Sequence, residues 1–235
     1  MDVLRDLVFQ GKAEGVVVVA DHQTAGRGRE HRAGEVRPWE SPAGKNLYLS
    51  AFVDARRAGD EAGRLPLAVG VAIAKTVGDY CPDHTVHIKW PNDVLVDDKK
   101  ISGVLIQSVS GEKGFLVGIG LNVNAQLSDF SPQTASIATS LRLITGSAFD
   151  LHGEALEKLL GHLSLTITHL SEDKGWDEIH RYVSDRLHQK GRRVSVVDQN
   201  YQGIGHGISV VDGALLVQKD DGTIDRVGAG DVNLI

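Results

Sequence analysis

The chain has 235 residues, of which 41% are hydrophobic and 24% carry a formal charge, a balance typical of a folded globular protein rather than a disordered one. Its formal net charge of -6 argues against the broad basic face that general binding to nucleic acid or to an anionic membrane requires. The single cysteine excludes an internal disulfide framework and a cysteine-based zinc site.

The first residues have neither the basic flank nor the apolar stretch of a secretory signal, and no apolar run is long enough to cross a bilayer. We therefore expect a soluble cytoplasmic protein with no membrane partner and no nucleic-acid partner. A chain of this length can form one large domain or a domain with a small appendage.

The N-terminal part reads as short helix, strand and functional loop. A helix is predicted over residues 3–9, and the β-branched run at 16–20 predicts a strand buried on both faces. A polar loop that begins at His22 follows this strand directly, a place where the scaffold holds functional loops in position. Residues 46–53 alternate as a second strand, and residues 65–80 suit a small-residue helix packed on a sheet.

In the polar loop, two glycines alternate with two arginines, as Gly26, Arg27, Gly28 and Arg29. Glycine lets the backbone come close to a ligand, and each guanidinium offers a planar fork of donors. The pattern predicts an anion clamp for a phosphate or a carboxylate. A solvated surface loop is the alternative, because short motifs recur by chance.

The segment 86–90 alternates as a strand and places Lys89 on the face opposite Trp90. Because Trp90 precedes Pro91, its backbone is pushed toward an extended conformation. We therefore expect Lys89 to be held in position near a strand end.

Three further strands are predicted at 94–96, 101–107 and 115–123. The last is interrupted by Gly118 and Gly120. Glycines inside a strand usually mark the close approach of a ligand or of another backbone.

Two packing helices are predicted at 154–170 and 176–187. Past Gly191 the pattern changes to short strands separated by turns, which predicts a small β-barrel. These strands are expected at 194–197, 203–210, 215–218 and 223–227. We predict two domains, 1–188 and 189–235.

Three motifs carry the polar chemistry: AGRGR at 25–29, KWPND at 89–93 and GIGLN at 118–122. None is a Walker loop or a dinucleotide fingerprint. In this order, and with KISGVL at 100–105 between the last two, they closely resemble biotin protein ligases. The resemblance runs from about Val16 to the end of the chain.

This resemblance implies an α+β fold of the class II synthetase and biotin ligase type, with a mixed β-sheet covered by helices and a small C-terminal SH3-like β-barrel. It also implies an ATP-dependent, Mg²⁺-dependent ligase that forms biotinyl-5′-AMP. The biotin is then transferred to a lysine of a biotin carboxyl carrier domain of a carboxylase.

Carried over position by position, the resemblance implies that Lys89 and Arg29 are catalytic. For biotin, it implies contacts from Gln23, Gly26, Arg27, Lys89 and Gly103. For the nucleotide, it implies contacts from Arg29, Arg32, Trp39, Asn92 and Asn122. Asp93 is open to three interpretations: a metal ligand, an acceptor for the incoming lysine's proton, or a cap of its turn.

Two features depart from the family pattern. The fifteen residues before Val16 contain no match to the Ser/Thr-Ser/Thr-Asn segment that binds the ureido ring of biotin in the family. Six residues, 33–38, separate Arg32 from Trp39, which is more than the pattern has. No helix-turn-helix segment precedes the catalytic domain, so a DNA-binding repressor role is not expected.

Two alternatives stay open at this point. One is a non-catalytic homologue that binds biotin or its adenylate, and the other is a lipoate or octanoate transferase of related fold. A homodimer formed through edge strands is also expected from the resemblance.

Overall fold

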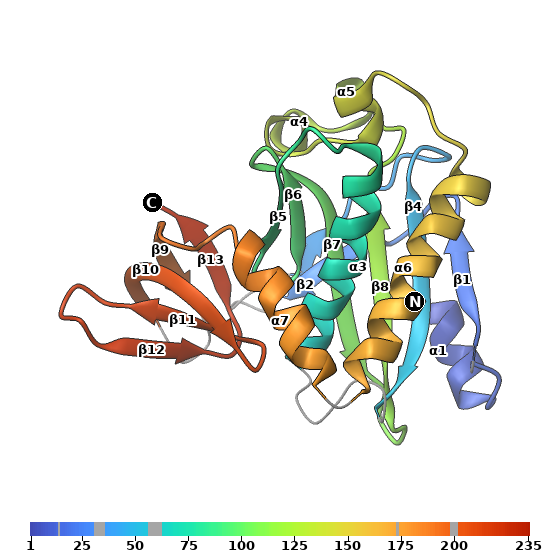
Figure 1. Ribbon diagram of the computed structural model, residues 1–235. Helices are drawn as coiled ribbons and strands as arrows, with labels where there is room; N and C mark the ends of the chain where they lie inside the picture. The colour runs from blue at the N-terminus through green and yellow to red at the C-terminus, as the bar shows by residue number, and fades with distance from the viewer. Residues whose placement is uncertain (14, 31–35, 56–62, 173, 198–201) are drawn as a thin grey trace.

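The computed structural model describes residues 1–13, 15–30, 36–55, 63–172, 174–197 and 202–235. A six-stranded sheet covered by helices stands beside a smaller five-stranded sheet (Figure 1). The predicted α+β class is confirmed.

The large sheet has the strand order β1-β4-β8-β7-β6-β5, and its described ladders are all antiparallel. The sheet expected to be mixed is thus antiparallel in its described ladders, and parallel pairing is found in isolated bridges, such as that between Ile88 and Leu187. The strands are β1 (Val17–Ala20), β4 (Leu47–Asp54), β5 (Val86–Lys89), β6 (Asp93–Val96), β7 (Lys99–Ser108) and β8 (Gly114–Leu121). Strand β4 lies inside this sheet, and its residues are largely buried on both faces.

Strand β1 was predicted to be fully buried, and this prediction is wrong, because all four of its residues are only partly buried. The strand lies at the edge of the sheet and pairs with β4. Both of its faces are nevertheless covered, because Val17 and Val19 pack on the main core while Val16 and Val18 pack on helix α1 (Asp2–Phe9) and its neighbours. Cover on both faces explains the continuous valine run.

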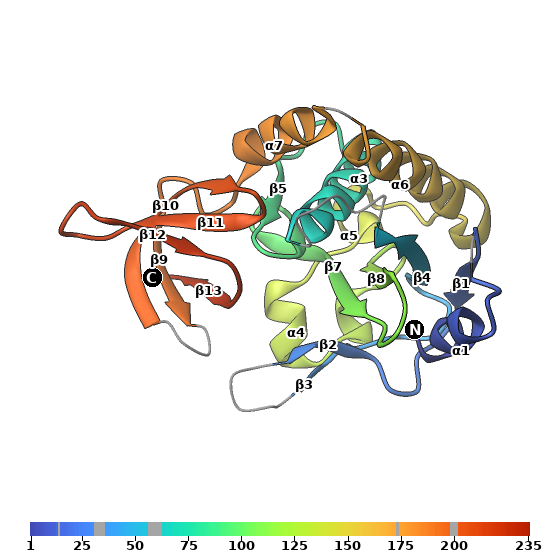
Figure 2. The same ribbon diagram turned by 90° about the horizontal axis from the view of Figure 1, so that it is seen from below.

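Three helices cover one face of the large sheet: α3 (Arg64–Tyr80), α6 (Leu156–Leu170) and α7 (Gly175–Arg186). Figure 2 shows them on one side, with α1 and the short strands β2 and β3 on the other. Helix α3 is buried along most of its length, because its alanine, glycine and valine side chains let it lie close to the sheet. The other helical segments in the described part of the chain are η1 (Leu127–Asp129), α4 (Pro132–Ile137), α5 (Leu141–Thr145) and the π-helical turn η2 (Leu151–Ala155).

Among the described helices, none combines the length and the apolar character needed to cross a lipid bilayer.

The Gly/Arg segment, expected as a loop, forms a strand. Strands β2 (Arg27–Glu30) and β3 (Val36–Pro38) pair antiparallel as a separate two-stranded ribbon. The pairing register shifts between Arg27 and Glu30, so β2 is irregular where it carries Arg29.

The small sheet has the antiparallel order β12-β11-β10-β9-β13 and is consistent with the expected SH3-like domain. Its strands are β9 (Arg193–Val197), β10 (Gln202–Val211), β11 (Ala214–Gln218), β12 (Ile224–Val227) and β13 (Asp231–Leu234). The first four were predicted, but β13 was not. One continuous cluster of buried apolar side chains joins the two sheets and includes Val196 and Leu215 of the small one. The domain boundary between residues 188 and 189 stays a prediction.

Candidate active site

A cavity opens between the β2–β3 ribbon, the corner that joins β5 to β6, strands β7 and β8, and strand β13 of the small sheet. The cavity therefore lies where the two sheets meet. The sequence-predicted site residues at its wall are Gln23, Arg27, Arg29, Trp39, Lys89, Asn92, Asp93 and Gly103.

The two arginines of β2 have different partners. Arg27 forms an ion pair with Asp2 of helix α1. Partial burial acts to raise the pKa of the Asp2 carboxyl, but the Arg27 guanidinium, the N-terminal ammonium and Arg5 together outweigh it, and the pKa lies below its usual value. Arg29 Nη1 donates to Asn92 Oδ1 at 3.3 Å, and its Nη2 donates to the Gly230 carbonyl at 2.7 Å. The guanidinium of Arg27 thus lies against helix α1. That of Arg29 spans the cavity edge, from strand β2, the clamp strand, to Asn92 and Gly230.

The KWPND segment is fixed by hydrogen bonds that join Trp90 to Gln189 and Gly213, which lie far along the chain. Trp90 is buried, and its indole N–H donates to the Gly213 carbonyl at 2.8 Å. The side chain of Gln189, which is fully buried, accepts from the Trp90 backbone N–H at 3.1 Å and donates to the Trp90 carbonyl at 2.8 Å. Lys89, the last residue of β5, therefore comes from a fixed strand end at the cavity wall, as expected.

Asn92 belongs to the same corner and is also fixed. Its Nδ2 donates to the Val104 carbonyl at 2.6 Å, and the Val104 N–H donates to the Asn92 carbonyl at 2.9 Å. The remaining amide oxygen accepts from Arg29. Asn92 thereby joins the clamp strand to the KWPND corner.

Trp39 lies over a floor made by two glycines of the large sheet. A Cβ built on Gly120 would lie 2.5 Å from Trp39 Cζ2, and one on Gly103 would lie 3.1 Å from Trp39 Cζ3. Any side chain at Gly120 would displace this ring. The indole nitrogen of Trp39 is buried and has no hydrogen-bond partner among the described residues. The glycine-interrupted strand thus admits a tryptophan ring at the cavity wall.

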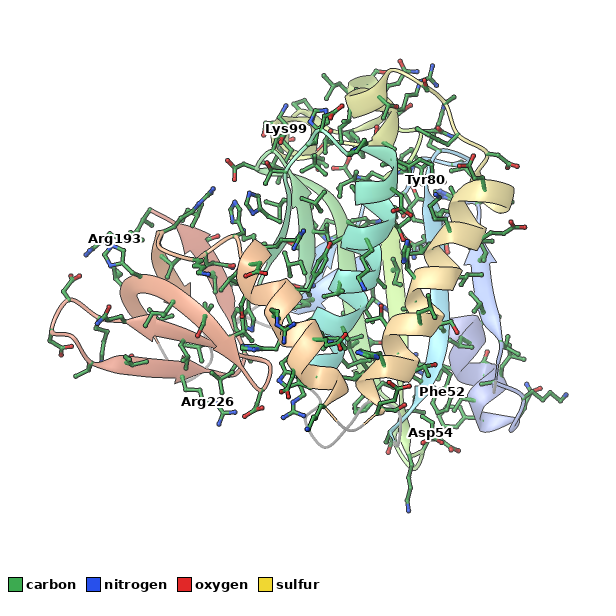
Figure 3. All side chains as sticks on the ribbon, viewed as in Figure 1. Phe52, Asp54, Tyr80, Lys99, Arg193 and Arg226 are labelled. Carbon is green, nitrogen blue, oxygen red and sulfur yellow. The ribbon has the colours of Figure 1, made fainter. Side chains whose placement is uncertain are left out.

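Lys100 is a cavity residue that the sequence prediction missed. Its Nζ lies 2.8 Å from Asp93 Oδ1 and 5.3 Å from the centroid of the Trp39 ring. A sequence signal for Lys100 exists, because it is the first residue of the KISGVL motif near the start of a strand. The sequence prediction took only Gly103 from that motif. Its neighbour Lys99 lies exposed at the β6–β7 turn (Figure 3).

The environment of Asp93 does not suit a resident metal ion. A lysine ammonium already lies against its carboxylate. The described part of the chain contains no group of three or more histidine, cysteine, aspartate or glutamate side chains that could hold a metal. The geometry instead pairs Asp93 with Lys100.

Two predicted residues, Gly26 and Asn122, do not line the cavity wall, and a third lies outside the described residues. Gly26 lies behind it, where its missing side chain allows contact with the Trp39 backbone: a Cβ there would lie 2.5 Å from the Trp39 carbonyl oxygen. Asn122 is 3% exposed, accepts from Asn46 Nδ2 at 3.2 Å and donates to the Thr139 carbonyl at 3.0 Å. Arg32 and residues 33–35 of the extended loop lie outside the described residues.

Strand β13 brings further residues that no sequence pattern indicated. Asp231, Val232 and Asn233 line the cavity, and Asp231 Oδ1 lies 3.7 Å from Arg29 Nη2. Met1 also reaches the wall, where its Sδ would lie 2.7 Å from a Cβ on Gly118. The cavity wall therefore contains four cationic side chains, Arg27, Arg29, Lys89 and Lys100. Arg27 is paired with Asp2 outside the cavity wall, and the other three come from β2, β5 and β7.

Comparison with known proteins gives consistent matches. The chain is 35% identical over 151 residues to the bifunctional ligase/repressor BirA of Bacillus subtilis, a match that covers 63% of this chain and 45% of that protein. It is 33% identical over 139 residues to the biotin–[acetyl-CoA-carboxylase] ligase of Mycobacterium tuberculosis, covering 58% of this chain and 50% of that protein. The matches thus span about half the length of these relatives.

Among solved structures, the biotin protein ligase from Aquifex aeolicus in complex with biotin and ATP superposes with a TM-score of 0.81 at 29% identity. The superposition covers 94% of this chain and 89% of that one. The sequence model of the biotin/lipoate A/B protein ligase family matches residues 1–124, which is more than half of the chain. The chain therefore belongs to the biotin/lipoate A/B protein ligase family.

Proposed function

We propose that this chain is an ATP-dependent biotin protein ligase that forms biotinyl-5′-AMP and transfers the biotin to a lysine of a biotin carboxyl carrier domain. The observation that carries the proposal is the convergence of Arg29, Lys89 and Lys100 on one cavity. The reaction must bring a carboxylate and a triphosphate together, so positioning and fixed positive charge supply most of the catalysis. The solved relative that binds biotin and ATP supports the same pair of substrates.

In the first step, a carboxylate oxygen of biotin attacks the α-phosphorus of ATP. A new O–P bond forms, and the bond to the bridging oxygen breaks so that pyrophosphate leaves. We assign Arg29 and Lys89 to the carboxylate and the α-phosphate, and Lys100 to the charge that develops on the phosphate oxygens. Gln23 and Arg27 are assigned to biotin, and Trp39 and Asn92 to the nucleotide.

In the second step, the amine of the acceptor lysine attacks the carbonyl carbon of the mixed anhydride. An amide bond forms, the C–O bond to AMP breaks, and the amine loses a proton to solvent. The cations that held the α-phosphate then stabilise the departing AMP.

Mg²⁺ enters this proposal as part of the nucleotide substrate. Magnesium is usually held by substrate phosphates with few protein carboxylates, which fits a cavity without a carboxylate cage among the described residues. The homodimer and the cytoplasmic location stay predictions.

The test is the biotin-dependent exchange of labelled pyrophosphate into ATP by the purified chain. We expect exchange that requires biotin and is not supported by lipoate or octanoate. Exchange with lipoate alone would support the transferase alternative. Tight binding of synthetic biotinyl-5′-AMP without any exchange would identify a non-catalytic homologue and contradict the proposal.

A further inference from the structure

Strand β13 completes the cavity from the small sheet. Its residues Asp231, Val232 and Asn233 lie at the wall, and the strand pairs with β9 on its other side. The small sheet is thus part of the site.

The contact between β13 and the clamp strand centres on Arg29. Its Nη2 donates to the Gly230 carbonyl at 2.7 Å and lies 3.7 Å from Asp231 Oδ1. Its Nη1 donates to Asn92 Oδ1 at 3.3 Å. Because the guanidinium is planar, partners at two of its nitrogens restrict both its position and the orientation of its plane.

The backbone at this contact requires glycine. Gly230 has a φ of 132°, in a region that residues with a side chain rarely adopt. The carbonyl of this residue is the one that accepts from Arg29 Nη2. Side-chain exposures of 28% for Arg29 and 29% for Asp231 leave the pair partly shielded from solvent at the cavity edge.

We propose that Asp231 is a positioning residue: together with the Gly230 carbonyl it aims the Arg29 guanidinium, so that the small sheet controls how firmly the reactive adenylate is retained. This inference rests on the proposed function, because it takes the anion held by Arg29 to be the phosphate of biotinyl-5′-AMP. Asp231 itself touches no reacting atom in this account. It acts through Arg29.

A merely structural role for Asp231, as a link between the two sheets, makes a different prediction. A link would lower the free energy of unfolding and, by displacing the small sheet from the cavity, would weaken biotin binding along with adenylate binding. A positioning residue loses its effect when Arg29 is removed, because the two substitutions then break the same interaction.

The test compares Asp231→Asn with Asp220→Asn as the matched control. Like Asp231, Asp220 pairs with an arginine, but this partner, Arg193, belongs to the small sheet and donates to the Asp220 carboxylate at 3.0 and 2.9 Å. Neither Asp220 nor Arg193 lines the cavity, and Figure 3 shows Arg193 on the part of the small sheet remote from helices α3 and α6. The release rate of synthetic biotinyl-5′-AMP and the affinity for biotin are measured for both variants, in the parent and in an Arg29→Ala background.

We expect Asp231→Asn to speed adenylate release about five-fold, the scale that partly exposed ion pairs support, while the affinity for biotin is unchanged. In the Arg29→Ala background it should add nothing, and Asp220→Asn should match the parent throughout. Equal release from Asp231→Asn and Asp220→Asn, or the same acceleration without Arg29, would overturn the positioning role alone. A parent chain that binds no biotinyl-5′-AMP would overturn the proposed function as well.

Discussion

Lys100 and Asp93 form an ion pair across neighbouring strands β7 and β6, with 2.8 Å between Nζ and Oδ1. The ammonium is also close to the glycine floor, because a Cβ on Gly103 would lie 3.2 Å from Nζ. Asp93 therefore holds a cation beside Trp39 at the cavity wall. The two side chains work as one unit, and substitution of either tests that view.

Replacing Lys100 by glutamine should lower the rate of adenylate formation about 100-fold, because a fixed charge that stabilises the transition state is lost. The initial rate of biotin-dependent pyrophosphate exchange measures this. Lys99→Gln is the control, since it removes the same charge from the next residue, which is exposed. A Lys100→Gln variant that exchanges at the parent rate would remove Lys100 from the proposed mechanism.

The substitution Asp93→Asn distinguishes two roles for Asp93, an anchor for Lys100 and a ligand of the metal. As an anchor, its loss should lower the rate of adenylate formation roughly ten-fold, because Lys100 is then no longer held where it stabilises the transition state, the order expected for loss of a charge-assisted contact. The Mg²⁺ concentration for half-maximal exchange should not change. The variant Asp93→Asn/Lys100→Gln should be no slower than Lys100→Gln. A marked rise in the Mg²⁺ requirement would show instead that Asp93 binds the metal.

Gly120→Ala should destabilise the fold by roughly 1–3 kcal/mol, because its Cβ would lie 2.5 Å from the Trp39 ring and force it to move. Urea unfolding measures the cost, and tryptophan fluorescence reports the movement of the ring. The control is Gly161→Ala in helix α6, where a Cβ meets nothing within 4 Å. That substitution should raise the free energy of unfolding by up to about 1 kcal/mol, because alanine has a higher helix propensity than glycine. If both variants were as stable as the parent, the close contact at Gly120 would have no energetic weight.

Glu40 follows Trp39 in the chain and ties the segment after strand β3 to Ser131, at the start of helix α4. Its carboxylate accepts from the Ser131 N–H at 2.8 Å and from the Ser131 hydroxyl at 2.6 Å. Partial burial acts to raise the pKa of Glu40, but hydrogen bonds from the Ser131 hydroxyl, the Thr134 hydroxyl and the Ser131 N–H outweigh it. The pKa therefore lies below its ordinary value of 4.5.

A carboxyl whose pKa is lowered in the folded state stabilises the fold above its ordinary pKa, and this contribution is lost as pH falls through the folded-state value. Glu40→Gln should therefore cost roughly 1 kcal/mol at neutral pH, and the gap to the parent should close on acidification below about pH 4.5. Urea unfolding between pH 7 and pH 3 measures the gap. Glu112→Gln, at an exposed turn, is the control. A gap that stays constant with pH would contradict this account of Glu40.

The pattern of apolar residues in the sequence predicted the main helices and strands well. Helix α3 was predicted at 65–80 and found at Arg64–Tyr80, and strand β4 was predicted at 46–53 and found at Leu47–Asp54. Both are long, mostly apolar segments bounded by polar and turn residues, a pattern that locates an element even where it is buried on more than one face. Strand β13 was missed, because a four-residue edge strand with polar residues offers no such pattern.

Motif position led to residues of which most line one cavity, but it did not settle their contacts. Asn122 shows the difference. It follows directly on the glycine-interrupted strand β8, yet its side chain is buried between Asn46 and Thr139. Which way a polar side chain turns at a strand end depends on the partners that tertiary packing brings there, and those partners lie far away in the sequence.

The sequence by itself determined the available chemistry: arginines between glycines, a lysine at a strand end, and a motif order that identifies the family. Only the tertiary structure decided which groups meet. Arg29 contacts the carbonyl of Gly230, 201 positions further along the chain, and Lys100 is paired with Asp93 beside Trp39. Such contacts depend on how two sheets pack and in which register their strands pair, which no local pattern of residues specifies.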